Sequence, residues 1–251
     1  SRRFHSATLL DDGKVLIAGG VVGPLITTDP KITELYNPIT GLFTSYTTGL
    51  ALPDARQGHT ATRLSNGCAA DTCVLFVGNS GVNPASTRIL NYNSTAPLSS
   101  TWSSPTKEMT YLRYNHSTVV LSDNKVLVTG GFGTKSGTST SVEIYNPTTK
   151  EWTDLSTNSS MATNRALHTS TKLQDGRVLV VGGYDGLKAL TTIEIFDPSD
   201  NTWTAPSASK VLNTARAMHT STLLSSGDVL ILGTYFQASG TISKTTEIWR
   251  R

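Results

Sequence analysis

Five copies of one short motif, spread along the 251 residues of this chain, limit the possible folds more than any other feature. Each copy has one histidine with an arginine three positions before it, and the histidines recur every 51 to 57 residues. A segment of that length is one supersecondary unit that cannot bury its apolar faces alone, so neighbouring copies must pack on each other. The motif pairs are Arg2 and His5, Arg56 and His59, Arg113 and His116, Arg165 and His168, and Arg216 and His219.

Each copy contains four short runs rich in β-branched and aromatic residues, separated by turn residues, which predicts four strands per copy. The first run alternates polar and apolar residues, whereas the second is continuously apolar, as in an interior strand covered on both faces. The third run reads Glu-hydrophobic-aromatic, except in the second copy, where Arg88 stands near the place of the glutamate. The fourth run carries an aromatic residue that we assign to packing between copies: Phe43, Trp102, Trp152 or Trp203.

Glycines mark two places in the repeat. Between the first and second runs, Asp12-Gly13, Asn66-Gly67, Asp175-Gly176 and Ser226-Gly227 predict tight hairpin turns. At the end of the second run, one or two glycines indicate a positive φ or the close approach of another backbone. These glycines are Gly19-Gly20, Gly78, Gly130-Gly131, Gly182-Gly183 and Gly233.

The order of these signals resembles the kelch repeat: Arg-x-x-His, an apolar run ending in Gly-Gly, Glu-hydrophobic-aromatic followed by Asn-Pro or Asp-Pro, and then Trp. The resemblance covers the chain almost end to end. It implies an all-β fold, a kelch-type β-propeller in which each copy is one blade of four antiparallel strands. We therefore predict one propeller domain over residues 1–251, with blades at about residues 2–55, 56–112, 113–164, 165–215 and 216–251.

The fifth copy stops just past its third run, so its blade is expected to lack the outer strand. Two interpretations follow, a closed five-bladed ring or a part of a six- or seven-bladed propeller, and the latter blade numbers are the more familiar ones for kelch propellers. We favour the closed ring, because an open arc would expose two large apolar faces. The free edge of blade five is a candidate for docking a strand or for self-assembly.

The antiparallel meander determines which loops share a face. Two kinds of connection emerge on one side, which we name the long-loop face: those from the second to the third strand and those from the fourth strand to the first strand of the next copy. These connections are long and varied. The tight turns emerge on the opposite side, the short-turn face. Because varied loops on a rigid scaffold commonly carry binding sites, we predict that the long-loop face binds the ligand.

The five motif arginines begin the first strands on the long-loop face. The resemblance implies that they would ring a channel mouth and meet an acidic ligand. In the alternative, which we favour, a blade carboxylate or carbonyl holds each arginine, with Glu34, Glu143, Glu194 and Glu247 as candidate partners. The histidines are expected to be buried and hydrogen-bonded rather than ligating. The candidate binding residues are Arg2, Arg56, Arg113, Arg165, Arg216, Tyr184 and Tyr235.

The sequence does not point to an enzyme. It has no Gly-x-Ser-x-Gly, His-Glu-x-x-His or phosphate-cradling pattern. A galactose-oxidase-like copper site would need a cysteine at the mouth, whereas both cysteines are predicted on the short-turn face. We expect a propeller without cofactor or metal that binds a protein partner, or alternatively a glycan. The loop carboxylates are Asp29, Asp54, Glu108 and Asp185, and the loop aromatics suited to a sugar are Tyr46, Tyr111, Tyr184, Tyr235 and Phe236.

Cys68 and Cys73 flank an insertion in the first hairpin of the second copy. Their placement makes a disulfide geometrically easy, worth roughly 2 kcal/mol for so small a loop. A disulfide implies an extracellular or cell-surface location. The other interpretation, a metal site, lacks further ligands nearby.

The remaining signals concern partners and modification. No apolar run approaches the ~18 residues of a membrane span, and no cluster of Lys and Arg would track a nucleic-acid backbone, although the net charge is +3. Glycosylation sequons begin at Asn93, Asn115 and Asn158. Asn158, in a long loop, is the best acceptor, Asn93 is the next candidate, and Asn115 lies inside the repeat motif.

Overall fold

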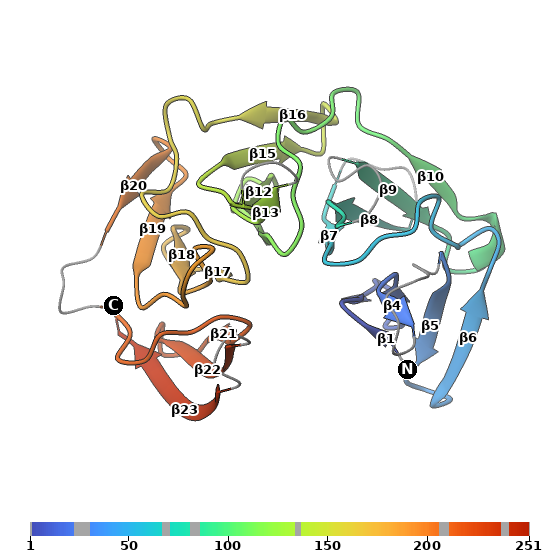
Figure 1. The fold of residues 1–251 in the computed structure, drawn as a ribbon. Coiled ribbons are helices and arrows are strands. Elements are labelled where there is room, and N and C mark those ends of the chain that lie inside the picture. Colours follow the sequence, from blue (N-terminus) through green and yellow to red (C-terminus); the bar gives the residue numbers. More distant parts are fainter. Residues whose placement is uncertain are drawn as a thin grey trace. The chain divides into compact units, whose positions relative to one another are not determined.

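The computed structural model of the protein describes residues 2–22, 31–66, 71–80, 86–133, 137–205, 211–236 and 241–250. Over these residues the chain is nearly all β, and the only helix is the short 3-10 turn η1 (Pro97–Ser99). One antiparallel sheet corresponds to each sequence repeat, which confirms the predicted fold class of β-propeller blades (Figure 1).

The strands follow one another in every sheet in the order predicted from the repeat. Blade one contains β2 (Ser6–Leu9), β3 (Val15–Ala18), β5 (Thr33–Asn37) and β6 (Leu42–Tyr46), and blade two contains β7 (Thr60–Leu64), β8 (Thr72–Val77), β9 (Thr87–Tyr92) and β10 (Thr101–Ser103). Blade three contains β11 (Ser117–Val120), β12 (Val126–Thr129), β15 (Val142–Asn146) and β16 (Glu151–Asp154), and blade four contains β17 (Thr169–Lys172), β18 (Val178–Val181), β19 (Ile193–Asp197) and β20 (Thr202–Thr204). Blade five contains β21 (Thr220–Leu223), β22 (Val229–Phe236) and β23 (Thr241–Trp249), and two small ribbons pair β1 (Arg2–Arg3) with β4 (Val21–Val22) and β13 (Phe132–Gly133) with β14 (Gly137–Thr138).

The blade-five sheet has three strands among the described residues, as the sequence predicted. The chain forms two compact units. The first comprises Ser1–Tyr114 with Tyr145–Trp152, and the second comprises Asn115–Ile144 with Thr153–Arg251. Ring closure and the single domain over residues 1–251 therefore stay predictions.

The hairpin between the first and second strands is closed by a residue with positive φ. In blade four the Gly176 N–H donates to the Leu173 carbonyl at 3.1 Å, and Gly176 has a φ of 89°. Blade three uses Asn124, with a φ of 65°, in the place of this glycine. Asparagine tolerates the left-handed region better than most residues, so the turn keeps its shape without the Asp-Gly signature. The turns at Gly13 and Gly227 are confirmed in the same way, whereas Gly67 lies outside the described residues.

The turn between the third and fourth strands ends with a second left-handed residue. The Gly41 and Lys150 N–H groups each donate to a carbonyl four residues earlier at 2.8 Å. Their φ values are 71° and 58°, and Asn201 has a φ of 58° at the same place in blade four. Lys150 therefore holds a conformation that a side chain disfavours.

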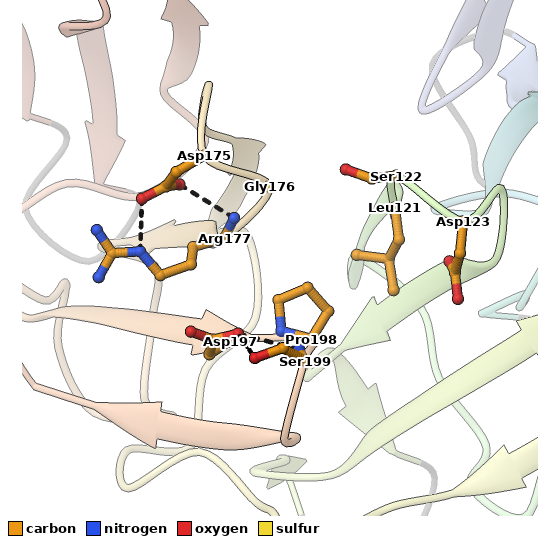
Figure 2. Close-up of a pocket in the computed structure, with 9 residues that line it drawn as sticks. All are labelled: Leu121, Ser122, Asp123, Asp175, Gly176, Arg177, Asp197, Pro198 and Ser199. Carbon is orange, nitrogen blue, oxygen red and sulfur yellow. Dashed lines mark hydrogen bonds and ion pairs between the residues drawn. The ribbon is translucent and has the colours of Figure 1, made fainter.

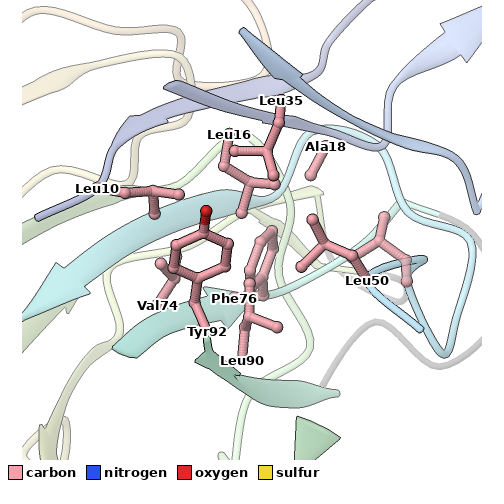
Figure 3. Packing of buried hydrophobic residues seen from close by; sticks show 10 residues of the cluster. Leu10, Leu16, Ala18, Leu35, Leu50, Val74, Phe76, Leu90 and Tyr92 are labelled. Atoms are coloured by element: carbon pink, nitrogen blue, oxygen red, sulfur yellow. The ribbon is translucent and has the colours of Figure 1, made fainter. Parts of the chain in front are cut away.

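Apolar side chains of adjacent blades form the cores, as the repeat requires. In the first unit, Leu16 and Leu35 of blade one lie in one buried cluster with Val74, Phe76 and Tyr92 of blade two (Figure 3). In the second unit, residues of blade four share a cluster with residues of blade five, namely Leu173, Leu179, Val181, Ile193, Ile195, Leu212, Val229, Ile231 and Trp249.

The fourth-strand tryptophans take part in this packing, whereas Phe43 is 59% exposed and its ring lies 4.8 Å from that of Tyr36 in the same blade, so its assignment to packing between copies is wrong. The rings of Tyr145 and Trp152 lie 5.2 Å apart, and those of Phe196 and Trp203 lie 5.0 Å apart. Trp152 is buried, and its indole N–H donates to the Thr87 hydroxyl of blade two at 3.1 Å. The assignment of this tryptophan to packing between blades is confirmed.

The glycine doublets are the places where one blade meets the backbone of the next. Gly182 has a φ of 58°, and a Cβ there would lie 2.6 Å from the Arg216 carbonyl oxygen and 3.0 Å from Cε1 of His219. The next residue, Gly183, donates its N–H to the same Arg216 oxygen at 2.7 Å. Both predicted reasons for the doublet, positive φ and close approach, are therefore confirmed.

Replacement of Gly182 by alanine should destabilise the fold by about 2 to 4 kcal/mol, because strain at positive φ adds to a collision with backbone that cannot move aside. Gly13→Ala is the matched control, since Gly13 also has positive φ but a Cβ there would meet no atom within 4 Å. Urea unfolding midpoints measure the difference, and equal losses for the two variants would contradict the packing argument.

Lys150→Gly should stabilise the protein by about 0.5 to 1 kcal/mol, because relief of left-handed strain exceeds the extra chain entropy of glycine. The Lys150 carbonyl, which accepts from the Thr106 N–H at 2.8 Å, is kept in the variant. Thr149→Gly, at a position without positive φ, should be destabilising instead. Thermal unfolding of both variants tests the assignment, and a loss of stability in Lys150→Gly counts against it.

Candidate functional site

The motif arginine lies inside its own blade and ties the second strand to the third. The Arg165 side chain is fully buried. It contacts the Glu194 carboxylate at 2.6 Å and donates to the Gly182 carbonyl at 2.6 Å. Arg216 repeats this arrangement with Glu247 at 2.7 Å and the Gly233 carbonyl at 2.9 Å.

The motif arginines of blades one, two and three differ in burial and in their contacts. Arg2, which is partly buried, contacts Glu34 at 2.8 Å and donates to the Gly19 carbonyl at 3.1 Å. Arg56 is fully buried, and burial lowers the pKa of its guanidinium to about 10. Arg113 is also buried, with its guanidinium carbon 6.0 Å from the ring centre of Tyr111. These contacts favour the structural interpretation, and a ligand role of the arginines stays a prediction.

Blade two shows how the missing glutamate is replaced. Asp54, from the loop before the motif, lies 2.7 Å from Arg88 and 3.7 Å from Arg56. Glu108 contacts Arg88 at 3.6 Å and accepts from the Thr87 N–H at 3.0 Å. Burial raises the pKa of Glu108, although Thr87 and Arg88 act against this. The net shift is upward. Both loop carboxylates therefore serve to hold buried or half-buried cations.

The motif histidines link neighbouring blades, as expected for buried and hydrogen-bonded side chains. Nε2 of His59 lies 2.9 Å from the Ser6 hydroxyl of blade one, and Nε2 of His219 lies 2.9 Å from the Thr169 hydroxyl of blade four. Burial lowers the pKa of His59 to about 3 and that of His219 to about 4, and the nearby arginines add to both shifts. His5 is exposed and is the exception.

The residue before each histidine has a left-handed backbone, which sequence reasoning missed. Their backbones are bonded in series: in the first unit the Gly58 N–H donates to the Phe4 carbonyl at 3.2 Å. In the second unit Leu167 donates to Asn115 at 2.8 Å, and Met218 donates to Leu167 at 2.9 Å. The sequence signal for this conformation was the presence of Gly58 and Asn115 at the position, because glycine and asparagine tolerate a positive φ better than other residues. The φ values are 59° for Phe4, 62° for Gly58, 51° for Asn115, 57° for Leu167 and 56° for Met218.

The loop of residues 184–190 in blade four is held by its own polar groups. The Asp185 carboxylate accepts from the Leu187 and Lys188 N–H groups, both at 2.8 Å. The Tyr184 hydroxyl donates to the Gly186 carbonyl at 2.8 Å. Burial raises the pKa of Asp185, but the two backbone hydrogen bonds outweigh it and leave the pKa lowered. Leu187, at the tip, is 86% exposed.

Both ends of this loop are bonded to the motif segments on either side. The Ala166 and Tyr184 backbones exchange hydrogen bonds at 3.0 and 2.8 Å, and the Arg216 N–H donates to the Leu190 carbonyl at 3.0 Å. The loop tip therefore shares the long-loop face with the next motif residues. Met218, in the motif of blade five, is 44% exposed.

The other predicted loop aromatics are less informative. Tyr184 has its ring 6.2 Å from that of Phe132. Tyr235 lies in β22, paired with Ile242, but its side chain lies outside the described residues, so its binding role stays a prediction. Tyr111 is exposed beside Arg113. Much of the predicted long loops falls on residues 23–30, 81–85, 134–136, 206–210 and 237–240, also outside the described residues.

A pocket of about 470 Å³ lies on the short-turn face of the second unit, at the hairpins of blades three and four (Figure 2). Its carboxylates are used by their own turns. Asp175 contacts Arg177 at 2.7 Å, and Asp197 accepts from the Ser199 hydroxyl at 2.7 Å. We therefore assign no ligand to this pocket.

The predicted modification sites differ in exposure. Asn158 is exposed in a turn, in keeping with its prediction as the better acceptor. Asn93 is half-buried, and its side-chain amide donates to the Ser99 hydroxyl at 3.2 Å. Cys73 is buried at the start of β8, whereas Cys68 lies outside the described residues, so the disulfide and glycosylation stay predictions. Over the described part of the chain, no helix has the length and apolar character needed to cross a membrane.

Comparison with known proteins agrees with this architecture. Residues 58–246 match the family model described as the KLHDC2/KLHL20/DRC7 Kelch-repeats domain. The chain is similar to Kelch-like protein 40 of Xenopus tropicalis, with 39% identity over 93 residues, and to that of Xenopus laevis, with 37% identity over 93 residues. Each match covers 37% of this chain and 14% of the relative, so the chain spans a small part of those proteins.

Stability should fall with acidification because the motif histidines are buried uncharged. The unfolded chain takes up a proton near pH 6.5 at His219, whereas the folded protein does so only near pH 4. The contribution is therefore complete above pH 6.5 and is lost as the pH falls toward 4, at up to about 1.4 kcal/mol per pH unit for each such histidine. His219→Gln should be less stable at neutral pH and should show a smaller change between pH 7 and pH 5. The measurement is the urea unfolding midpoint of variant and wild type as a function of pH. An equal change of the midpoint with pH in the two proteins would refute the assignment.

Proposed function

Because this chain belongs to the kelch-repeat family, whose propellers typically serve as protein-interaction domains, we propose that it is a non-catalytic propeller that holds a protein partner on its long-loop face. One observation carries the proposal. Leu187 is 86% exposed at the tip of a loop whose polar groups bond to one another. Such a loop loses little freedom when it binds, so an exposed apolar side chain there is well placed to contact a partner.

The use of the polar residues supports binding rather than catalysis. The buried Arg165 and Arg216 are paired with carboxylates and carbonyls, and the buried His59 and His219 bond hydroxyl groups of the neighbouring blade. The loop carboxylates Asp54, Glu108 and Asp185 are engaged by cations or backbone N–H groups. These groups are tied to the scaffold, which leaves the loop surfaces as the variable part.

Three finer features belong to the same proposal. A Cys68–Cys73 disulfide would place the protein outside the cell or at the cell surface, and Asn158, which is exposed, would carry a glycan there. The outer edge of β23 would accept a strand or support self-assembly. A carbohydrate ligand is the alternative occupant of the long-loop face, with Tyr184 as its aromatic contact.

Affinity capture from the source cells tests which face binds. Proteins retained by the wild type should be lost with Leu187→Asp, because a charge would replace the exposed apolar contact. They should be kept with Ile39→Asp, the matched control, since Ile39 is 92% exposed in a short turn between the third and fourth strands of blade one. Quantitative mass spectrometry of the three samples provides the measurement.

Two results would contradict the proposal. One is the loss of retained proteins with Ile39→Asp and not with Leu187→Asp. The other is saturable binding on a glycan array that Tyr184→Ala abolishes, which would establish the carbohydrate alternative.

A further inference from the structure

The junction between blades four and five shows what covers the side of a blade. In each blade the first three strands hold one set of side chains toward the next blade, here named the leading face, and the alternate set toward the blade before, named the trailing face. At this junction one buried cluster joins the two faces. The leading face of blade four contributes Leu179, Val181, Ile193 and Ile195, and the trailing face of blade five contributes Leu223, Val229, Ile231 and Trp249.

The polar contacts of the same junction come from the repeat motif. The Thr169 hydroxyl of blade four lies 2.9 Å from Nε2 of His219 and 2.6 Å from the Ser221 hydroxyl of blade five. Gly182, at the end of the second strand, leaves room for the Arg216 carbonyl. A covered junction therefore has three parts: an apolar cluster, a hydroxyl opposite an imidazole, and a glycine opposite a carbonyl.

Blade five repeats all three parts on its own leading face. The strand register places Leu230 and Ile248 where blade four has Leu179 and Ile195. Thr220 stands at the place of Thr169, and Gly233 at the place of Gly182. The leading face of blade five consists of Thr220, Thr222, Leu230, Leu232, Thr246 and Ile248, none of which carries a charge.

This leading face is uncovered within the described part of the chain. Leu232 is 41% exposed and Ile248 is 48% exposed, whereas Val181 and Ile195 at the same places in blade four are buried. A Cβ at Gly233 would meet no atom within 4 Å, whereas one at Gly182 would lie 2.6 Å from the Arg216 carbonyl oxygen. An apolar face of this kind marks a site of interaction.

Blade one carries the trailing face that fits. At the places of Leu223, Val229 and Ile231 it has the same three residue types, namely Leu9, Val15 and Ile17. Leu9 is 60% exposed, and Val15 and Ile17 are half-buried, whereas Val229 and Ile231 are fully buried in the covered junction. The motif histidine of blade one, His5, is exposed, whereas His219 is buried.

The covered junction identifies the occupant of the uncovered face. The leading face of blade four binds a trailing face with leucine, valine and isoleucine at fixed places, and blade one presents the same set. Because the leading face of blade five carries no charge, a charged partner would find no complementary group on it. The two faces differ from each other, so copies that associate through them are arranged head to tail.

We propose that the leading face of blade five binds the trailing face of blade one in a second copy of this chain. The His5 imidazole then lies at hydrogen-bond distance from the Thr220 hydroxyl, and the Arg2 carbonyl lies against Gly233. Leu9, Val15 and Ile17 cover the exposed apolar side chains of blade five. This inference goes beyond the proposed function and does not depend on a partner at the long-loop face.

Cysteine cross-linking between two variants of the full chain tests the contact. Ala7 stands at the place of Ser221, whose hydroxyl contacts that of Thr169 in the covered junction, and Thr220 stands at the place of Thr169. Ala7→Cys and Thr220→Cys are prepared separately, mixed and oxidised. The mixture should give a covalent dimer, whereas wild type and either variant alone should not. Ala7→Cys mixed with Ser226→Cys, in an exposed turn of blade five, is the control and should give none.

Sedimentation over a range of concentrations measures the association itself. Leu232→Asp should weaken it by about tenfold or more with an unchanged thermal midpoint, because the charge enters the centre of the contact but is exposed in the free chain. Gly233→Ala should weaken it as strongly, because the new Cβ would meet the incoming Arg2 carbonyl. Leu98→Asp is the matched control, since Leu98 is 65% exposed in η1 of blade two, and should leave the association unchanged.

Three outcomes would overturn the inference. One is a wild type that stays monomeric at every concentration and a mixture that gives no cross-link. Another is a monomeric, internally cross-linked product from the double variant Ala7→Cys/Thr220→Cys, which would establish ring closure within one chain instead. The last is association that survives both Leu232→Asp and Gly233→Ala, which would place the contact elsewhere, as at the edge of β23. Capture of proteins that depends on Leu187 is unaffected by these results, so the proposed function stands or falls separately.

Discussion

The hydrogen bond from a glycine N–H to the carbonyl of the next blade's motif arginine is the contact on which the blade architecture depends. It recurs from Gly20 to Arg56 at 2.9 Å, from Gly131 to Arg165 at 2.9 Å and from Gly183 to Arg216 at 2.7 Å. The glycine before each donor leaves room for that carbonyl and for the histidine ring that follows it. This one hydrogen bond thus fixes the end of the second strand in one blade, the start of the first strand in the next blade and the position of a buried imidazole. The apolar clusters then fill the space between the two sheets.

The buried guanidinium stiffens the same junction from within the blade. A buried ion pair contributes little net stability, but removal of one partner is costly because the other charge is left uncompensated. Blade two shows that the requirement is for a carboxylate near the guanidinium rather than for glutamate at one position, since Asp54 takes over where Arg88 replaces the glutamate. The repeated polar residues are thereby committed to the architecture. The residues of the 184–190 loop, by contrast, belong to one blade alone and are not part of the repeated junction.

The sequence predicted the blades well because every signal for them is local and recurs in most of the five copies. Strand period, hairpin glycines and glycine doublets all concern residues within one copy or at a fixed offset. The features that were missed have no such signal. Asn124 replaces a turn glycine, and the left-handed Leu167 and Met218 look like ordinary apolar residues in the sequence. The rigidity of the 184–190 loop depends on Thr138 and Asn164, which lie 47 and 21 residues before Asp185, and no spacing rule brings them together.

Local rules and global fold agree almost everywhere in this chain, and the exceptions are therefore informative. Phe4, Leu167 and Met218 occupy a backbone position that Gly58 fills without strain, yet the series of hydrogen bonds that connects these positions within each unit is the same in either case. The side chain is therefore not needed for the scaffold. A scaffold built from identical junctions offers identical surroundings at each blade, so a binding surface that distinguishes partners must arise where blades differ. At the position before the histidine the backbone direction is fixed, whereas the side chain differs from blade to blade. The blades that do not have glycine there carry backbone strain.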